Sequence, residues 1–142
     1  MRRKGEVTFI GVVEEAGELT RVRIFPEFCV GLQSLDRFSH ILLLYWFHLR
    51  DQEEDRRVLQ VTPRRHLGAP RVGVFSSRSP SRPNPIGLCV TKLVKIQDCT
   101  LQVRGLDASQ GSPIVDIKPY IPRADSIPEA RVPDWTLGGP PT

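Results

Sequence analysis

The sequence lacks a long apolar segment. Its longest apolar run, residues 41–47, is far shorter than the roughly 20 residues that a helix needs to cross a bilayer. A basic stretch follows Met1, but no continuous apolar stretch of 7–15 residues follows it, so we expect no secretory signal. We therefore expect no membrane partner and a cytoplasmic location.

Cysteine is scarce, with three residues at widely separated positions: Cys29, Cys89 and Cys99. The odd number and the absence of a CxxC pair argue against both a zinc site and a disulfide framework. The cysteines are predicted to be reduced thiols, packed mostly in the core of a cytosolic protein. No metal is expected.

The glycine-rich and nucleophile motifs of common enzyme families are also missing. GxGxxG, GxxxxGK[ST], HExxH and GxSxG do not occur. No helical pattern of 10–15 residues separates the apolar segments either, so a Rossmann-like arrangement is not supported. A nucleotide cofactor, if used, must be held without the familiar phosphate loop.

Acidic residues are absent from one long block. Residues 56–97 contain nine Lys or Arg and no Asp or Glu, whereas the rest of this 142-residue chain has a net charge of −5. The overall charge of +4 therefore comes from one block. This block indicates a polyanion or a phosphate-bearing ligand, and a basic surface without a ligand is an equal alternative.

Short β-branched or alternating segments recur along the chain, and they predict an all-β barrel or sandwich. Residues 26–38 are predicted to form a short helix or turn, and the proline-rich tail after Pro119 to be extended. The length favours one domain with a single core. The predicted strands are residues 7–13, 20–25, 40–48, 58–61, 71–75, 88–96, 100–104 and 114–117.

Several local features carry their own expectations. The segment 40–48 is apolar throughout, which predicts a strand buried on both faces. His40 and His48 bracket it about 26 Å apart, too far for a shared metal ion. Leu93 breaks the alternation of its strand and predicts a bulge. His66 is expected to be solvated.

The first candidate for chemistry is the proline-stiffened loop of residues 73–87, GVFSSRSPSRPNPIG. Its prolines limit the conformational freedom of Arg78, Arg82 and Asn84, which lowers the entropy lost on binding. Arginine binds carboxylate or phosphate through two parallel hydrogen bonds. In the alternative interpretation the arginines cap backbone carbonyls of the loop itself.

The second candidate is the segment SPIVDIKPY, in which Asp116, Lys118 and Tyr120 alternate and share one face. A carboxylate, an ammonium and a phenol together suit substrate binding or proton transfer. Taken alone, these residues favour the plainer interpretation of a surface ion pair beside a packed tyrosine.

Three blocks of sequence together resemble the TrmO family, also called the TsaA-like or YaeB-like domain. They are LDRFSHILLLYWFH (35–48), GVFSSRSPSRPNPIGL (73–88) and GSPIVDIKPYIP (111–122), and the resemblance extends over residues 7–134. It implies a small single-domain β-barrel over residues 1–142 that binds S-adenosylmethionine (SAM) and forms a homodimer. It also implies methylation of N6 of threonylcarbamoyladenosine beside the anticodon of tRNA.

By this resemblance, two groups of residues acquire roles. The residues implied to hold SAM are Phe47, His48, Leu49, Arg78, Leu88, Leu106, Asp107 and Ala108. Those implied to lie at the substrate are Asp116, Lys118, Tyr120, Arg82 and Asn84, with Asp116 or Tyr120 as the base. The remaining arginines of the basic block, expected to contact the tRNA backbone, are Arg56, Arg57, Arg64, Arg65 and Arg71.

The chain also departs from the family pattern. Family members usually carry an N-terminal S-P motif and a loop of some twenty residues, whereas here Ile10–Val13 leads directly into Glu14–Gly17. Two alternatives therefore stay open: a non-catalytic member that binds SAM, a nucleotide or RNA, and a methyltransferase for a small metabolite.

Overall fold

The computed structural model describes residues 2–141, and it divides the chain into two compact units. The first comprises residues 2–48 and 86–121, and the second comprises residues 49–85 and 122–141. The prediction of one domain stays a prediction. In the described part of the chain, no helix is long and apolar enough to cross a membrane.

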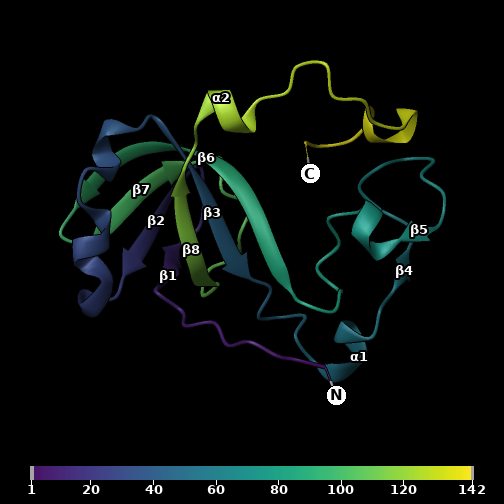
Figure 1. Ribbon diagram of the computed structural model, residues 1–142, viewed down its shortest axis with the longest axis horizontal. Helices are drawn as coiled ribbons and strands as arrows, with labels where there is room; N and C mark the ends of the chain where they lie inside the picture. Colours follow the sequence, from purple (N-terminus) through teal and green to yellow (C-terminus); the bar gives the residue numbers. More distant parts are fainter. Residues whose placement is uncertain (1, 142) are drawn as a thin grey trace. The chain divides into compact units, whose positions relative to one another are not determined.

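The first unit is a closed antiparallel barrel in the strand order β1-β2-β7-β6-β3-β8 (Figure 1). The predicted all-β barrel is therefore confirmed. Two 3-10 segments, η1 (Pro26–Leu32) and η2 (Leu35–Arg37), connect β2 to β3. The barrel strands are β1 (Gly11–Glu15), β2 (Leu19–Ile24), β3 (His40–Trp46), β6 (Ile86–Gln97), β7 (Thr100–Arg104) and β8 (Pro113–Pro119).

Alternating side chains of these strands fill the barrel. In β2, Thr20, Val22 and Ile24 are buried, while the residues between them are exposed. Because successive side chains of a strand point to opposite faces, the alternation in the sequence places every second residue inside. Leu101 and Val103 of β7 are fully buried in the same core. Each such side chain stabilises the fold by about 1.5–3 kcal/mol.

The apolar strand β3 follows this rule too, so the prediction that it is buried on both faces is wrong. Ile41 and Leu43 are fully buried, but Leu42 and Leu44 on the opposite face are only half-buried. A barrel covers only the inner face of its strands. The outer apolar side chains of β3 must therefore be explained separately.

The β6–β7 hairpin contains the predicted bulge, since its register shifts between Leu93 and Lys95. Its turn places Asp98 and Cys99 at φ 51° and 62°. Cys99 is joined by a disulfide to Cys29 in η1, with Cα atoms 5.5 Å apart. The prediction of three reduced thiols is therefore wrong: Cys89 alone of the three cysteines lies outside the disulfide. Residues separated by 70 positions are brought together by the fold, which spacing in the sequence does not reveal.

The second unit has little regular structure. The predicted strands 58–61 and 71–75 shrink to a pair of two residues each, and the tail is interrupted by two helical turns. His66, predicted to be solvated, is only 7% exposed and packs edge-on against Trp135 of the tail. Its elements are α1 (Glu53–Arg56), β4 (Gln60–Val61), β5 (Val72–Gly73), η3 (Val74–Ser76), α2 (Pro122–Asp125) and η4 (Asp134–Thr136).

Candidate functional site

At one end of the barrel an aromatic pair meets a carboxylate. The Tyr45 ring lies edge-on to the Phe47 ring, with centroids 5.3 Å apart. The Tyr45 hydroxyl donates a hydrogen bond of 2.7 Å to Oδ1 of Asp107. Gly87 lies against both rings, and a Cβ there would come within 2.8 Å of Tyr45 and Phe47 carbons. The sequence can therefore accept only glycine at position 87 without displacing the pair.

The segment that carries Asp107 is anchored on both sides. Leu106 and Ala108 are buried in the barrel core, whereas Asp107 between them is exposed. Gly111 has φ 88°, and a Cβ on it would lie 3.7 Å from Nε2 of His48. Five of the residues predicted to hold SAM thus gather at this barrel end: Phe47, His48, Leu106, Asp107 and Ala108.

Three other predicted residues lie on the outer face of the barrel. In the register of the sheet, Leu44 of β3 stands between Leu88 of β6 and Asp116 of β8. One pair further along, Leu42 stands between Val90 and Lys118. The predicted donor residue Leu88 and the predicted substrate residues Asp116 and Lys118 therefore share one surface. Leu88 and Val90 are about half exposed, at 47% and 48%.

The polar groups of this face are partnered with one another. Nζ of Lys118 lies 3.0 Å from Oδ2 of Asp116, and both side chains are exposed. Oδ1 of Asp116 accepts a hydrogen bond from the backbone N–H of Ile117. Tyr120 follows the strand and lies edge-on to His40, with centroids 6.4 Å apart. This is the surface ion pair beside a packed tyrosine that the residues alone favoured.

The proline-rich loop of the second unit is held together by Arg82. Its Nη1 donates to the carbonyls of Ser77 and Ser79 at 3.1 and 3.0 Å, and its Nη2 donates to the carbonyl of Val74 at 3.3 Å. Desolvation by burial lowers the pKa of Arg82. The alternative interpretation of this loop, in which an arginine caps backbone carbonyls, therefore describes Arg82.

Arg56 performs a similar task on the other side of the loop. Its Nε donates to the carbonyl of Pro83 at 2.9 Å, and its Nη2 lies 3.5 Å from Oδ1 of Asn84. Asn84 is thus oriented by an arginine that was expected to contact tRNA. Arg78, in contrast, is exposed, and within residues 2–141 no ion pair holds its guanidinium. Leu49 is 69% exposed.

The structure distributes the predicted site residues over the two units. One group lies at the barrel end and on the outer face, and the second unit holds Leu49, Arg78, Arg82 and Asn84. Sequence reasoning missed Tyr45 and Gly87. Tyr45 is the polar-tipped residue in an otherwise apolar strand, and a buried hydroxyl usually requires a partner. That signal was available in the sequence, whereas the contact to Asp107 was not.

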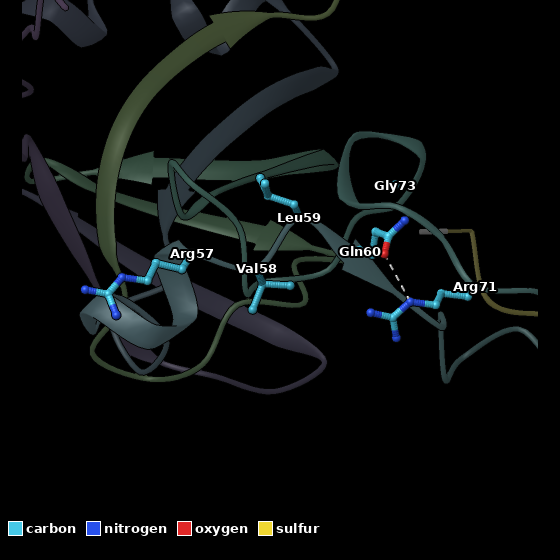
Figure 2. A pocket seen from close by; sticks show the side chains of 6 residues that line it. All are labelled: Arg57, Val58, Leu59, Gln60, Arg71 and Gly73. Atoms are coloured by element: carbon cyan, nitrogen blue, oxygen red, sulfur yellow. Dashed lines mark hydrogen bonds between the residues drawn. The ribbon is translucent and has the colours of Figure 1, made fainter. Parts of the chain in front are cut away.

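An open groove of about 730 Å³ lies in the second unit. Arg57, Val58, Leu59, Gln60, Arg71 and Gly73 line it (Figure 2). None of these residues belongs to the predicted donor or substrate sets. Among the described residues, no group of three or more His, Cys, Asp or Glu side chains is placed to bind a metal ion.

The chain matches known proteins over most of its length. The family model of the tRNA-methyltransferase O N-terminal domain matches residues 11–126. A probable S-adenosyl-L-methionine-binding protein of Methanothermobacter thermautotrophicus is 46% identical over 112 residues, which are 79% of this chain and 77% of the relative. Human tRNA (adenine(37)-N6)-methyltransferase is 42% identical over 106 residues, 75% of this chain and 23% of the relative.

A solved structure agrees with these matches. The crystal structure of TrmO from Pseudomonas aeruginosa superposes with a TM-score of 0.74 and 27% sequence identity. The match covers 99% of this chain, which spans 65% of the length of that TrmO chain. The resemblance to the TrmO family that the three sequence blocks indicated is thereby confirmed, and the chain belongs to the tRNA-methyltransferase O N-terminal domain family.

Proposed function

We propose that the protein is a SAM-dependent methyltransferase that acts on N6 of threonylcarbamoyladenosine next to the anticodon of tRNA. The observation that carries the proposal is the family match over residues 11–126, which includes all thirteen predicted site residues. The names of the relatives supply its two parts. The archaeal relative is named for binding SAM, and the human relative is named as a methyltransferase for N6 of adenine 37 in tRNA.

The barrel end fits the donor. A nucleoside with a sulfonium group needs a surface for a flat ring, an acceptor for ribose hydroxyls and negative charge near the cation. Phe47 offers an aromatic surface, and Asp107 offers a carboxylate whose Oδ1 is held by Tyr45 at 2.7 Å. The side chains of Phe47, His48 and Asp107, with the backbone of Leu106 and Ala108, would hold the donor. Three further residues are proposed to contribute to SAM binding, each from its own segment: Leu49, Leu88 and Arg78.

The outer face beside it carries the groups proposed for the substrate. A sulfonium donor supplies an electrophilic methyl group, so the protein mainly has to align the acceptor nitrogen and accept its proton. Asp116 or Tyr120 is the proposed base, and Lys118, which is ion-paired with Asp116 at 3.0 Å, holds that carboxylate in place. Bound SAM would supply the methyl group and keep its sulfur as the leaving thioether, and Asp116 or Tyr120 would accept the proton from N6.

Arg82 and Asn84 are proposed to support the substrate from the second unit. Arg82 is bonded to three carbonyls of its own loop, so it acts by holding the shape of that loop. Asn84 keeps its amide nitrogen available, because its Oδ1 faces Arg56. These roles agree with a loop whose rigidity is needed for recognition.

Two copies of the chain are proposed to form the working enzyme. Leu42, Leu44, Leu88 and Val90 form an apolar band on the outer face, and monomers rarely expose such bands. We expect Val90→Glu to convert a dimer to a monomer, measured by light scattering, with Lys92→Glu as the control on the same strand. The protein is proposed to act in the cytoplasm, since tRNA modification takes place there.

The decisive experiment is methylation of purified threonylcarbamoylated tRNA with labelled SAM. We expect label in the modified tRNA and none in the same tRNA without the threonylcarbamoyl group. Arg78→Ala should weaken SAM binding about tenfold, because a charge-assisted contact is lost. No product despite measured SAM binding would reject the tRNA methyltransferase.

A non-catalytic SAM-binding protein is the second candidate, and two observations favour it. Asp116 and Lys118 are paired with each other, and Arg82 donates three hydrogen bonds to carbonyls of its own loop. Calorimetric binding of SAM without methylation of any tRNA would establish this candidate. If no SAM binds, both candidates fail.

A further inference from the structure

The groove of the second unit has a charge at two of its sides and an apolar surface between them. Arg57 follows α1, and Arg71 precedes β5, so the two guanidinium groups come from separate segments. In Figure 2, Val58 stands between their side chains, and Leu59, the next residue along the chain, also lines the groove. The site proposed for the donor contains none of these residues.

Both arginines can exchange their present partners for phosphate at low cost. Arg57 is paired with Glu53 one helical turn away, and the two side chains are 72% and 77% exposed. Exposed ion pairs of this kind contribute about 0–1 kcal/mol. Nε of Arg71 donates to Oε1 of Gln60 at 3.3 Å, a bond that leaves its other donors open to solvent. The nearby carboxylate of Asp55 instead accepts a hydrogen bond from Ser81.

The apolar part of the groove is exposed to an unusual degree. Leu59 is 62% exposed. Its backbone is held in place, because its carbonyl accepts a hydrogen bond of 2.8 Å from the N–H of Val74. An exposed apolar surface between two cations suits an unstacked base whose neighbouring phosphates are bound.

We propose that this groove binds a single-stranded segment of RNA, with phosphates on Arg57 and Arg71 and a base against Leu59. Within the second unit, residues 56–85 contain seven basic side chains and no acidic ones, so the charge of this segment is complementary to RNA. A volume of about 730 Å³ accommodates one nucleotide with its flanking phosphates. The inference rests on the proposed tRNA substrate for its biological role, and it names where an unpaired part of that substrate is held.

The test measures binding of a fluorescent eight-nucleotide single-stranded RNA to the full-length protein by anisotropy over a range of salt concentrations. Arg57→Ala and Arg71→Ala should each weaken binding about fivefold and lower the slope of log Kd against log salt by about one. Arg37→Ala, an exposed arginine in η2, is the charge-matched control and should change neither value. Equal losses for all three variants would show diffuse attraction and overturn the proposal.

A second arm isolates the base contact. Leu59→Ala should weaken binding of the RNA but leave binding of an abasic oligoribonucleotide of the same length unchanged. Equal effects on both probes, or no effect on either, would overturn the placement of the base. Thermal unfolding of each variant is compared with that of the parent protein, and the surface location of all four residues predicts unchanged midpoints.

The failure of this inference can be told apart from failure of the proposed function. SAM binding is measured on the same groove variants, and it should stay at the parental value. A groove variant that loses RNA binding but still binds SAM would support the groove as the RNA-binding site. The parent protein could instead fail to methylate tRNA while its RNA binding still depends on Arg57 and Arg71. That result would reject the proposed methyltransferase activity and support the groove as an RNA-binding site.

Discussion

The barrel and the second unit are stabilised by different interactions. The barrel is closed by six strands around a core in which side chains such as Leu43, Val22 and Leu101 are fully buried. In the second unit, Val74 is the fully buried aliphatic side chain, and guanidinium groups bonded to backbone carbonyls hold the loop. Burial depends on the whole core being formed, whereas these bonds act within a few residues. We therefore expect damage to the barrel to be global and damage to the second unit to be local.

The largest expected effect concerns the disulfide of the barrel. Cys29→Ser removes a cross-link between residues 70 positions apart. The free energy of unfolding should fall by about 4 kcal/mol, because the unfolded chain regains the entropy of a long loop. Urea unfolding followed by circular dichroism measures it. Cys89→Ser, which alters the cysteine outside the disulfide, is the control, and equal midpoints for the two variants would contradict the prediction.

A cavity in the barrel core should lower the free energy of unfolding by nearly as much as loss of the disulfide. Leu43→Ala truncates a fully buried side chain of β3 and should lower the free energy of unfolding by about 3 kcal/mol. Leu67→Ala in the second unit is the matched control, since Leu67 is 96% exposed and should change stability by less than about 0.5 kcal/mol. A similar loss in both variants would erase the contrast between the two regions.

Removing the hydrogen bonds that Arg82 donates within the proline-rich loop should have a smaller effect on stability, confined to the second unit. Arg82→Gln removes the charged donors to the carbonyls of Ser77, Ser79 and Val74, worth about 2 kcal/mol. Hydrogen exchange should accelerate at the amides of Ser77 and Ser79 and stay unchanged in β3. The control is Arg78→Gln, an exposed neighbour. Faster exchange throughout the barrel would mean that the two regions unfold together.

The smallest expected effect lies at the barrel end. Tyr45→Phe removes the hydrogen bond to Asp107 and should lower the free energy of unfolding by about 1 kcal/mol. It should also weaken SAM binding, because the carboxylate is no longer held. A double-mutant cycle with Asp107→Asn tests this, and strictly additive effects on SAM affinity would refute the coupling.

The strands of the barrel were predictable where apolar and polar residues alternate regularly along a segment. The strand at residues 100–104 was predicted with the bounds that β7 has, because Leu101 and Val103 alternate with polar residues. The bulge at Leu93 was visible as a break in that alternation. In contrast, the predicted strand at 71–75 kept only Val72–Gly73, since it continues into the 3-10 turn η3. Alternation predicts strands only where a partner strand is available to pair with them.

The sequence allowed candidate site residues to be proposed as a set, but it did not predict their arrangement. The motif residues Asp116 and Lys118 were recognised, and their parity correctly placed them on one face. The sequence did not reveal that this face lies on the outside of the barrel, beside Leu42 and Leu44. The commitment of Arg82 to its own loop was one of two interpretations, and only the distances to the carbonyls decided between them.

What the sequence lacks was informative in some respects and misleading in others. By itself it determined an all-β chain without a phosphate loop, its family and its acid-free basic block, since composition, period and motifs are local properties. The scarcity of cysteine led to a wrong conclusion about the thiols. Only the tertiary structure joined Cys29 to Cys99, placed Tyr45 against Asp107 and formed the groove between Arg57 and Arg71. These contacts link residues far apart in the chain, and only the closed fold makes them neighbours.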